Sequence, residues 1–234
     1  MSQYQALVLG ASGAIGSAFV EHFQNDLSCS MVVSLSRQSE LHFELENEDS
    51  MARCAARLQS ATGSFGACQF KWIIDATGAL TIEGQGPEKR LEALNAKQLL
   101  KQFEVNAVGP ALLMKHFFPL LLSQEPSCYA TLSARVGSIE DNHKGGWYGY
   151  RAAKAARNML LQTAAIEAAR KKPLCVFAAL QPGTVQSKLS SGFVAADNAM
   201  LPEESVSKLM AVMSDLKPNG RAQFVDHAGQ LIPW

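Results

Sequence analysis

The sequence predicts an α/β fold with a doubly wound parallel sheet, three layers and a single domain. Strand-like and helix-like segments alternate along the 234 residues, which is the pattern of a sheet built from β–α–β units. Several strand-like segments are almost entirely apolar, as expected when helices cover both faces of a parallel sheet. The length suffices for one large core and is short for two enzyme domains.

The first half of the chain contains four apolar runs bounded by polar or turn residues. These runs predict strands at Gln5–Leu9, Met31–Ser36, Leu41–Leu45 and Phe70–Ala76, of which Leu41–Leu45 is the weakest. Helices are predicted at Ala14–Asn25 and Glu48–Thr62. In the second helix, Met51, Ala55 and Leu58 recur at helical spacing and share one face.

The second half begins with a long helix over 95–122. Asn95 at the cap and Gln98 three residues later form a capping-box pattern, and apolar residues recur to about Leu122. Two further helices are predicted at Gly149–Ala169 and Pro202–Asp215. Strands are predicted at Cys128–Ser133, Leu174–Gln181 and Gln223–Val225.

Composition argues against several classes of function. Lys+Arg and Asp+Glu both number 21, so no basic excess predicts binding to nucleic acid or to a membrane surface. No uncharged apolar run approaches the roughly 20 residues of a spanning helix, and the polar start of the chain does not resemble a signal peptide. The 5 cysteines are scattered without metal-ligand spacing, which predicts reduced thiols, no metal site and a cytoplasmic location.

A turn of small residues, Gly10–Gly16 (G-A-S-G-A-I-G), joins the first strand to the first helix. Small residues let the backbone approach a pyrophosphate, and the start of a helix offers free N–H groups and the positive end of its dipole. An ordinary tight turn would use the same residues. The place of this turn at the first β–α connection favours a dinucleotide site of the Rossmann type.

The end of the second strand bears on the choice of dinucleotide. An acidic residue there binds the ribose of NAD, whereas an Arg accommodates the 2′-phosphate of NADP. This chain has Ser36 and Arg37 there and no carboxylate. Arg37 can pair with a phosphate by charge-assisted hydrogen bonds, to which Ser36 and Ser12 can add. We therefore expect NADP(H); a solvated surface charge is the other interpretation of Arg37.

Tyr150 and Lys154 are four residues apart and share one face of a predicted helix. An ammonium beside a phenol favours the phenolate and lowers the tyrosine pKa from its usual value of about 10. Such a tyrosine can protonate a carbonyl oxygen as hydride reaches the carbon. The pair also arises by chance on helices, and Tyr148, which has no lysine four residues on, is expected to be a packing or loop residue.

Pro110 lies inside the long helix. Because proline has no N–H, it cannot bond the carbonyl of Asn106 four residues back, so we expect a kink and a free acceptor there. That carbonyl could hold a water between solvent and Lys154. Alternatively, Pro110 only bends the helix around the core.

Together these features resemble the short-chain dehydrogenase/reductase family over nearly the whole chain. The stretches 133–139 and 145–148 are similar to the subgroup around the myxobacterial C-factor protein and related small carbonyl reductases. The matching features, in the order found in the family, are the glycine turn, Asp75-Ala76-Thr77-Gly78, Asn106, Ser133, Tyr150-x-x-x-Lys154 and Pro182-Gly183-Thr184.

The resemblance implies a role for each matching residue. Tyr150 would be the general acid/base, Lys154 would bind the nicotinamide ribose and lower the tyrosine pKa, and Asn106 would hold a relay water. The long helix and the Tyr150 helix would pack against a second subunit in a homodimer or homotetramer. The implied cofactor contacts are Gly10, Ser12, Ala14, Ile15 and Gly16 at phosphate and ribose, Glu44 and Leu45 near adenine, Ala76 and Gly78 on the adenosine side, and Pro182, Gly183 and Val185 at the nicotinamide.

The chain departs from the family at the catalytic serine. The family usually has paired serines, the second of them catalytic, and strict alignment puts Ala134 at that position. In a regular strand Ser133 would point to the other side. A bulge could redirect Ser133, which we take as the catalytic serine, or Ser138 could reach in. The usual N-N-A-G is also altered, to the sequence of residues 75–78.

Two functions remain. The first is an NADP(H)-dependent oxidoreductase that interconverts a small carbonyl compound and its alcohol. The second is a cofactor-binding regulatory or signalling protein with vestigial catalysis, which the altered serine favours and the retained Tyr150 and Lys154 oppose. The segment 186–201 is expected to form part of a lid over the substrate.

Overall fold

The structure is a computed structural model that describes residues 3–60, 68–187 and 199–234. Short 3-10 helices at Leu91–Ala93, Phe118–Leu120 and Arg135–Gly137 supplement the main elements. These elements are β1 (Tyr4–Leu9), α1 (Ala14–Asn25), β2 (Cys29–Leu35), α2 (Glu48–Gln59), β3 (Trp72–Asp75), α3 (Ala96–Phe103), a π-helical turn (Glu104–Val108), α4 (Gly109–Phe117), β4 (Ser127–Leu132), α5 (Tyr148–Ala168), β5 (Cys175–Gln181), α6 (Pro202–Asp215) and β6 (Ala222–Asp226).

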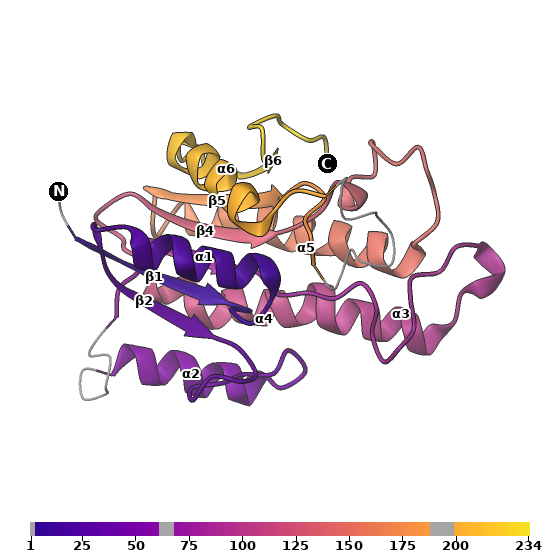
Figure 1. Cartoon of the computed structure of the whole chain (residues 1–234), viewed down its shortest axis with the longest axis horizontal. Helices are drawn as coiled ribbons and strands as arrows, with labels where there is room; N and C mark the ends of the chain where they lie inside the picture. Colours follow the sequence, from indigo (N-terminus) through magenta and orange to yellow (C-terminus); the bar gives the residue numbers. More distant parts are fainter. Residues whose placement is uncertain (1–2, 61–67, 188–198) are drawn as a thin grey trace.

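The six strands form one parallel sheet in the order β2-β1-β3-β4-β5-β6 (Figure 1). From β1 the chain adds β2 on one side and later β3 on the other, so the direction of winding reverses between β1 and β3. Ligands of doubly wound sheets bind at the carboxyl ends of the strands at such a switch point. Leu9 and Asp75 are partners in the register, so the ends of β1 and β3 lie side by side there.

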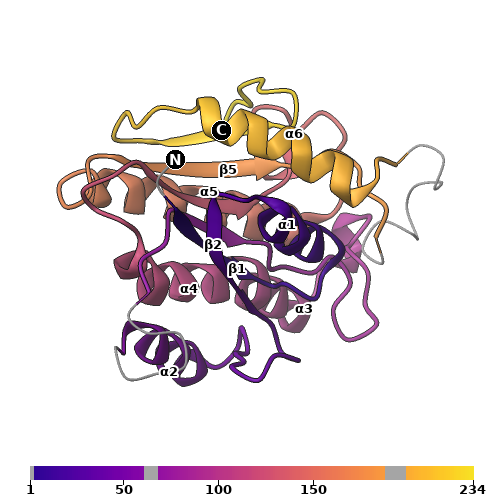
Figure 2. The same ribbon diagram turned by 60° about the vertical axis from the view of Figure 1, so that its left-hand side comes forward.

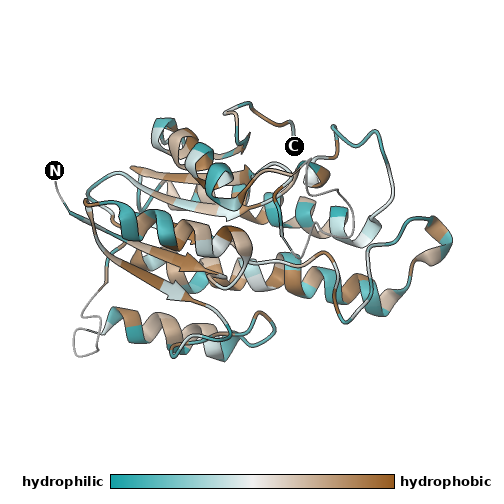
Figure 3. Ribbon diagram, in the orientation of Figure 1, coloured by the Kyte–Doolittle hydropathy of each residue, from teal (hydrophilic) through white to brown (hydrophobic). Residues whose placement is uncertain are grey.

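Alternate residues of the strands enter two apolar clusters on opposite faces of the sheet. In β1, Leu7 and Leu9 belong to the cluster that includes α2, α4 and α5, whereas Ala6 and Val8 belong to the cluster with α1 and α6. Figure 2 shows α1 next to α6, with α2 and α4 lower in the view, and the strands are predominantly hydrophobic in Figure 3. The predicted doubly wound, three-layer fold is confirmed.

The predicted strand at Leu41–Leu45 is wrong. Glu44 makes only an isolated antiparallel bridge to Asn47, at a turn that leads into α2. The connection from β2 is too short for a parallel neighbour, which needs a crossover of about a dozen or more residues. The apolar pattern arises because Phe43 is buried in the core. The turn leads directly into α2, whose N-cap residue Asn47 accepts a hydrogen bond from the N–H of Ser50.

The predicted long helix is confirmed with a break in its middle. Asn95 caps α3 as expected, accepting from the N–H of Gln98. The helix then widens into the π-helical turn, where the Gly109 N–H reaches the carbonyl of Glu104, and Pro110 follows in the first turn of α4. A π turn is one way a helix accommodates a missing N–H donor, and such turns often occur at functional sites.

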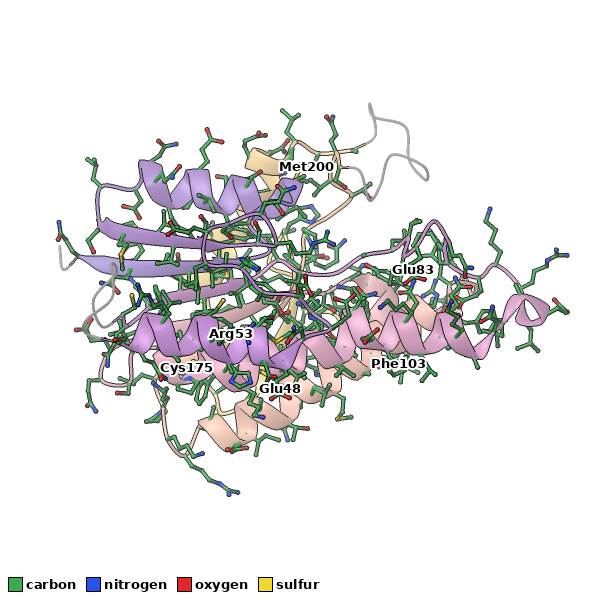
Figure 4. All side chains as sticks on the ribbon, turned by 90° about the horizontal axis from the view of Figure 1, so that it is seen from below. Glu48, Arg53, Glu83, Phe103, Cys175 and Met200 are labelled. Atoms are coloured by element: carbon green, nitrogen blue, oxygen red, sulfur yellow. The ribbon has the colours of Figure 1, made fainter. Side chains whose placement is uncertain are left out.

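The amino-terminal end of α2 is joined to α4 by charge. Glu48, labelled in Figure 4, accepts from Lys115 and from His116, whose Nε2 lies 3.0 Å from its carboxylate. The helix predicted over Glu48–Thr62 ends at Gln59, and Thr62 lies outside the described residues. Within the described part of the chain, every helix is too short or too polar to span a lipid bilayer.

Candidate active site

The glycine turn brings β1 and α1 into very close contact. Gly10 has a φ of +82°, and a Cβ on Gly16 would lie 2.2 Å from the carbonyl oxygen of Gly10. Helix α1 can therefore begin this close to the turn only with glycine at both positions. Its N-cap residue is Gly13, and no side chain caps its first amides. This arrangement suits an anionic group at the start of α1.

The loop after β3 lies against this turn. A Cβ on Gly10 would lie 3.0 Å from the carbonyl carbon of Ala76. A Cβ on Gly78 would lie 2.9 Å from Asn106 Oδ1 and 3.4 Å from Lys154 Nζ. The structure thus places the predicted residues Ala76 and Gly78 between the glycine turn and the predicted catalytic lysine.

Tyr150 and Lys154 occupy the first turns of α5, as their spacing predicts. Both side chains are buried, and Nζ of Lys154 lies 5.6 Å from the centre of the Tyr150 ring. The lysine donates to the carbonyl of Leu132 at the end of β4, at 2.9 Å. The edge of Trp147 contacts the tyrosine ring with centroids 6.2 Å apart. The pair is held at the carboxyl edge of the sheet, on the side of the switch point.

The electrostatic surroundings of this pair differ from the expectation. Burial raises the pKa of Tyr150 to about 12, and the positive charge of Arg157 opposes this shift. The pKa of Lys154 lies well below its usual range because of burial and the neighbouring Arg157, partly offset by Asp75. The predicted lowering of the tyrosine pKa by Lys154 is therefore wrong for this structure: the loss of water around the phenol is the larger effect, and the ammonium is engaged by a backbone carbonyl.

The Asn106 side chain connects the π-helical turn to the loop after Gly78. Its Oδ1 accepts from the N–H of Ala79 at 3.0 Å, while its Nδ2 donates to the carbonyl of Ala79 and to Gln102 Oε1, both at 2.8 Å. Asn106 is fully buried. The side chain thus has a fixed structural position beside Lys154, and the relay-water role of its backbone carbonyl stays a prediction.

The serine candidates have protein partners. Ser133 is buried and donates to Asn158 Oδ1 on α5 at 2.7 Å. Ser138 is also buried and donates to the carbonyl of Trp234 at 3.4 Å. Ala134 follows Ser133 in extended conformation and is partly exposed. Both hydroxyls donate to protein acceptors. The structure therefore does not indicate which serine would bind the substrate in the way the resemblance implies.

Of the residues predicted to select NADP, Ser36 and Arg37 follow the end of β2 and Ser12 lies in the glycine turn. Arg37 and Ser12 are exposed, while Ser36 is buried and accepts from the N–H of Gln38 at 3.1 Å. Glu44 is exposed in the turn before α2. Leu45 packs against α4, where a Cβ on Gly109 would lie 2.8 Å from its carbonyl oxygen.

The loop after β5 carries the predicted nicotinamide contacts. Ser205 at the start of α6 donates to the carbonyl of Pro182 at 2.7 Å, and Gly183 has a φ of +82°. Val185 is buried and forms an isolated parallel bridge with Met200, which Figure 4 labels. Most of the predicted lid, residues 188–198, lies outside the described residues.

Three polar groups near the site were missed by reasoning from the sequence. Arg157 on α5 is 3% exposed. The sequence indicated it only as a charged residue three positions after Lys154, on the same face of the helix. Glu88 accepts from the N–H of Gly149 at 3.0 Å, at the start of α5. The ring of His227 lies 3.3 Å from where a Cβ on Gly183 would stand. The last two lie in irregular segments, where no periodic pattern indicates which residues face the interior.

Comparison with known proteins identifies relatives of this chain. The short chain dehydrogenase family matches residues 4–198. A 1-hydroxy-2-glutathionyl-2-methyl-3-butene dehydrogenase of Rhodococcus sp. (strain AD45) is 25% identical over 191 residues, which is 82% of this chain and 78% of that protein. C-signal of Myxococcus xanthus is 30% identical over 137 residues, 58% of this chain and 78% of that protein.

Solved structures share the fold. An NADPH-bound carbonyl reductase from chicken fatty liver has a TM-score of 0.85 at 20% identity, with 100% of both chains covered. The carbonyl reductase Sniffer of D. melanogaster has a TM-score of 0.83 at 20% identity, covering 99% of this chain and 100% of that chain. The resemblance noted in the sequence is confirmed, and this chain belongs to the short chain dehydrogenase family of oxidoreductases.

Proposed function

We propose that the protein is an NADP(H)-dependent reductase of small carbonyl compounds, or the reverse alcohol dehydrogenase, with Tyr150 as general acid/base. The observation that carries the proposal is the position of Tyr150 and Lys154. Both are buried at the start of α5. Close contacts lead from α1 to this pair: Gly16 lies against Gly10, Gly10 lies against Ala76, and Gly78 lies near Lys154 Nζ. A nicotinamide, when bound, would exchange hydride with the substrate carbon.

The residues present fit a dinucleotide. A side chain at Gly16 would collide with the backbone of Gly10, and one at Gly10 would press against the backbone of Ala76, so backbone lines this part of the proposed cradle. A side chain at Gly78 would press against the side chains of Asn106 and Lys154. The uncapped start of α1 can receive a phosphate. Arg37 is exposed and can pair with a 2′-phosphate. The chicken carbonyl reductase structure holds NADPH and the structure of a similar short-chain dehydrogenase/reductase from Burkholderia multivorans holds NADP, which supports the same choice here.

The proposed contacts follow the order of the elements. Glu44 and Leu45 would approach the adenine, and Pro182, Gly183 and Val185 would lie at the nicotinamide. The phosphate and ribose contacts would come from Gly10, Ser12, Ala14, Ile15, Gly16, Ser36, Arg37, Ala76 and Gly78.

The chain's own residues would then control one proton. Tyr150 Oη would donate to the carbonyl oxygen of the substrate during reduction and accept from the alcohol during oxidation. Lys154 would bind the ribose and hold its ammonium near the phenol. Asn106 would keep the π-helical turn in place for a relay water. Because the hydroxyl of Ser133 is bonded to Asn158, we expect Ser133 to contribute less to substrate orientation than a serine at position 134 would.

The exposed apolar residues of α3 and α5 support a homodimer or homotetramer. Leu100, Met159, Leu160 and Ile166 are all exposed on these helices, and apolar side chains of this kind gain stability when a second subunit covers them. The free cysteines fit the proposed cytoplasmic location. Light scattering on the purified protein would show a mass of two or four chains; a monomer at micromolar concentration would contradict this assembly.

The decisive test measures NADPH oxidation against a panel of ketones and aldehydes. Wild type is compared with Tyr150→Phe and with Tyr148→Phe, a matched control two residues earlier on the same helix. We expect Tyr150→Phe to lose about 10²–10⁴-fold in kcat, with NADPH affinity retained, and Tyr148→Phe to keep most of the activity. Equal rates for wild type and Tyr150→Phe would favour the regulatory alternative.

A further inference from the structure

Arg157 and Asp75 form a buried ion pair between α5 and the end of β3. Arg157 is 3% exposed and Asp75 is 0% exposed, and Nη2 of the arginine lies 2.5 Å from Oδ2 of the aspartate. A buried charge is tolerated when it is paired and when its other polar atoms also find partners. The surroundings of this pair meet both conditions.

The ends of β3 and β4 supply the additional partners. Nε of Arg157 donates to Thr131 Oγ1 at 2.6 Å, and the same hydroxyl donates to Asp75 Oδ2 at 3.1 Å. The other carboxylate oxygen of Asp75 accepts from the backbone N–H of Thr77 at 3.0 Å and from the Thr77 hydroxyl. Asp75 therefore holds the loop that follows it through Thr77. Arg157 links this loop and the end of β4 to helix α5.

Arg157 also reaches the proposed cofactor loop directly. Its Nη1 donates to the carbonyl of Thr77 at 2.9 Å, and Gly78 is the next residue. A Cβ on Gly78 would lie 3.4 Å from Lys154 Nζ and 3.7 Å from Arg157 Nη1, so the two cations approach the same point. One side chain thus links the loop that would face the cofactor to the helix that carries the catalytic pair.

We propose that Arg157, through its ion pair with Asp75, is a positioning residue that fixes Ala76–Gly78 against the helix of Tyr150 and Lys154. This inference rests on the proposed function, because it gives Arg157 a part in the same site. A guanidinium can bond Asp75, Thr77 and Thr131 at once, which the compact ammonium of a lysine cannot do. Its fixed charge has a second effect: it opposes the rise that burial causes in the pKa of Tyr150.

Two variants separate the geometry of Arg157 from its charge. Arg157→Lys keeps the charge and loses the planar fork. Asp75→Asn combined with Arg157→Met removes both charges, so that no uncompensated ion is left in the interior. Arg170→Met, at an exposed arginine beyond the end of α5, is the matched control. NADPH affinity is measured by fluorescence and folding by thermal unfolding. The pH dependence of kcat/KM for alcohol oxidation gives the base limb, which is the rise of the rate with pH as Tyr150 loses its proton.

For Arg157→Lys we expect NADPH binding about tenfold weaker and an unshifted base limb. For the double variant we expect similarly weak binding and a limb shifted toward alkaline pH, because the cation that opposes the rise in the Tyr150 pKa is gone. Wild-type affinity and an unshifted limb in the folded double variant would overturn the proposal. Loss of folding in both variants would also overturn it, since Arg157 would then be purely structural. The NADPH arm needs no turnover, so it still tests Arg157 if the protein reduces no carbonyl.

Discussion

Backbone atoms and glycines form the β1–α1 side of the site, whereas buried charged side chains form the side below Tyr150 and Lys154. At the first side, an added Cβ on Gly16 would lie 2.2 Å from a backbone oxygen. At the second, the guanidinium of Arg157 and the carboxylate of Asp75 are almost completely buried. The first side (the space-limited side) has no room for an added side chain, and the second (the charge-limited side) depends on a paired buried charge. The first should therefore be disrupted by larger residues and the second by substitutions that leave one charge unpaired.

The starts of two helices show the same contrast. Asn47 caps α2 with its side chain, whereas α1 starts at Gly13 without a side-chain cap. A capped helix satisfies its own first amides, and an uncapped one leaves them available to an anion. Because α5 and α6 also begin without a side-chain cap, the missing cap alone does not mark a ligand site; at α1 it coincides with the close glycine contacts.

The largest effect on cofactor binding is expected from Gly16→Ala, which breaks the space-limited side. The new Cβ would collide with the carbonyl of Gly10, and because that atom belongs to the backbone, α1 itself must shift. We expect NADPH binding to weaken at least about 100-fold, equivalent to about 2.7 kcal/mol, in equilibrium titrations. Gly13→Ala is the matched control, since its Cβ would make an ordinary contact at 3.5 Å. Equal affinities for the two variants would contradict the steric argument.

On the charge-limited side, the largest effect is expected on the free energy of unfolding. Asp75→Asn alone and Arg157→Met alone each leave one buried charge unpaired, which costs about 3–5 kcal/mol of unfolding free energy. The double variant leaves none and is expected to recover most of that loss. Urea unfolding of the four proteins gives the coupling energy. Additive losses in the double variant would show that the pair is not coupled.

The two directions of the reaction should respond differently to pH, because Tyr150 on the charge-limited side must be protonated for one and deprotonated for the other. Burial raises the pKa of Tyr150 to about 12, so at neutral pH the phenol is protonated and ready to act as an acid. Carbonyl reduction should therefore change little with pH near neutrality. Alcohol oxidation needs the phenolate, and its kcat/KM should rise about tenfold per pH unit below this pKa. A limb near pH 7 for oxidation would show that the bound cofactor changes this pKa greatly.

The smallest effect is expected at the exposed edge of the cofactor side. Arg37→Ala removes a cation that would face the 2′-phosphate and nothing from the fold, because Arg37 is exposed. We expect NADPH affinity to fall about tenfold at low salt, with less difference at high salt, where exposed charges are screened. NADH affinity should not change. An equal loss for both nucleotides would remove Arg37 from cofactor selection.

The sequence features that the structure brings together are local ones. The glycine turn, the Tyr150–Lys154 spacing and the proline after Asn106 each occupy a few consecutive residues, and the structure places all three at one edge of the sheet. The strand predicted at Leu41–Leu45 failed because an apolar run alone carries no information about the length of the crossover it needs.

The charged side of the site could not be predicted for a different reason. Asp75 and Arg157 are 82 residues apart, and an ion pair across that separation leaves no periodic pattern. Asp75 was noticed only as a change from the family's asparagine. Once the fold brings β3 against α5, the change is explained, because an aspartate there pairs with the arginine that follows Lys154.

The most direct test of the central claim is a crystal structure of the protein with NADPH. The claim requires the nicotinamide ring to lie beside the buried Tyr150, at a distance that lets a carbonyl carbon approach the ring to about 3–3.5 Å while its oxygen meets the phenol. The 2′-phosphate should lie at Arg37. A nicotinamide bound away from α5, or a Tyr150 hydroxyl turned from it, would contradict the account.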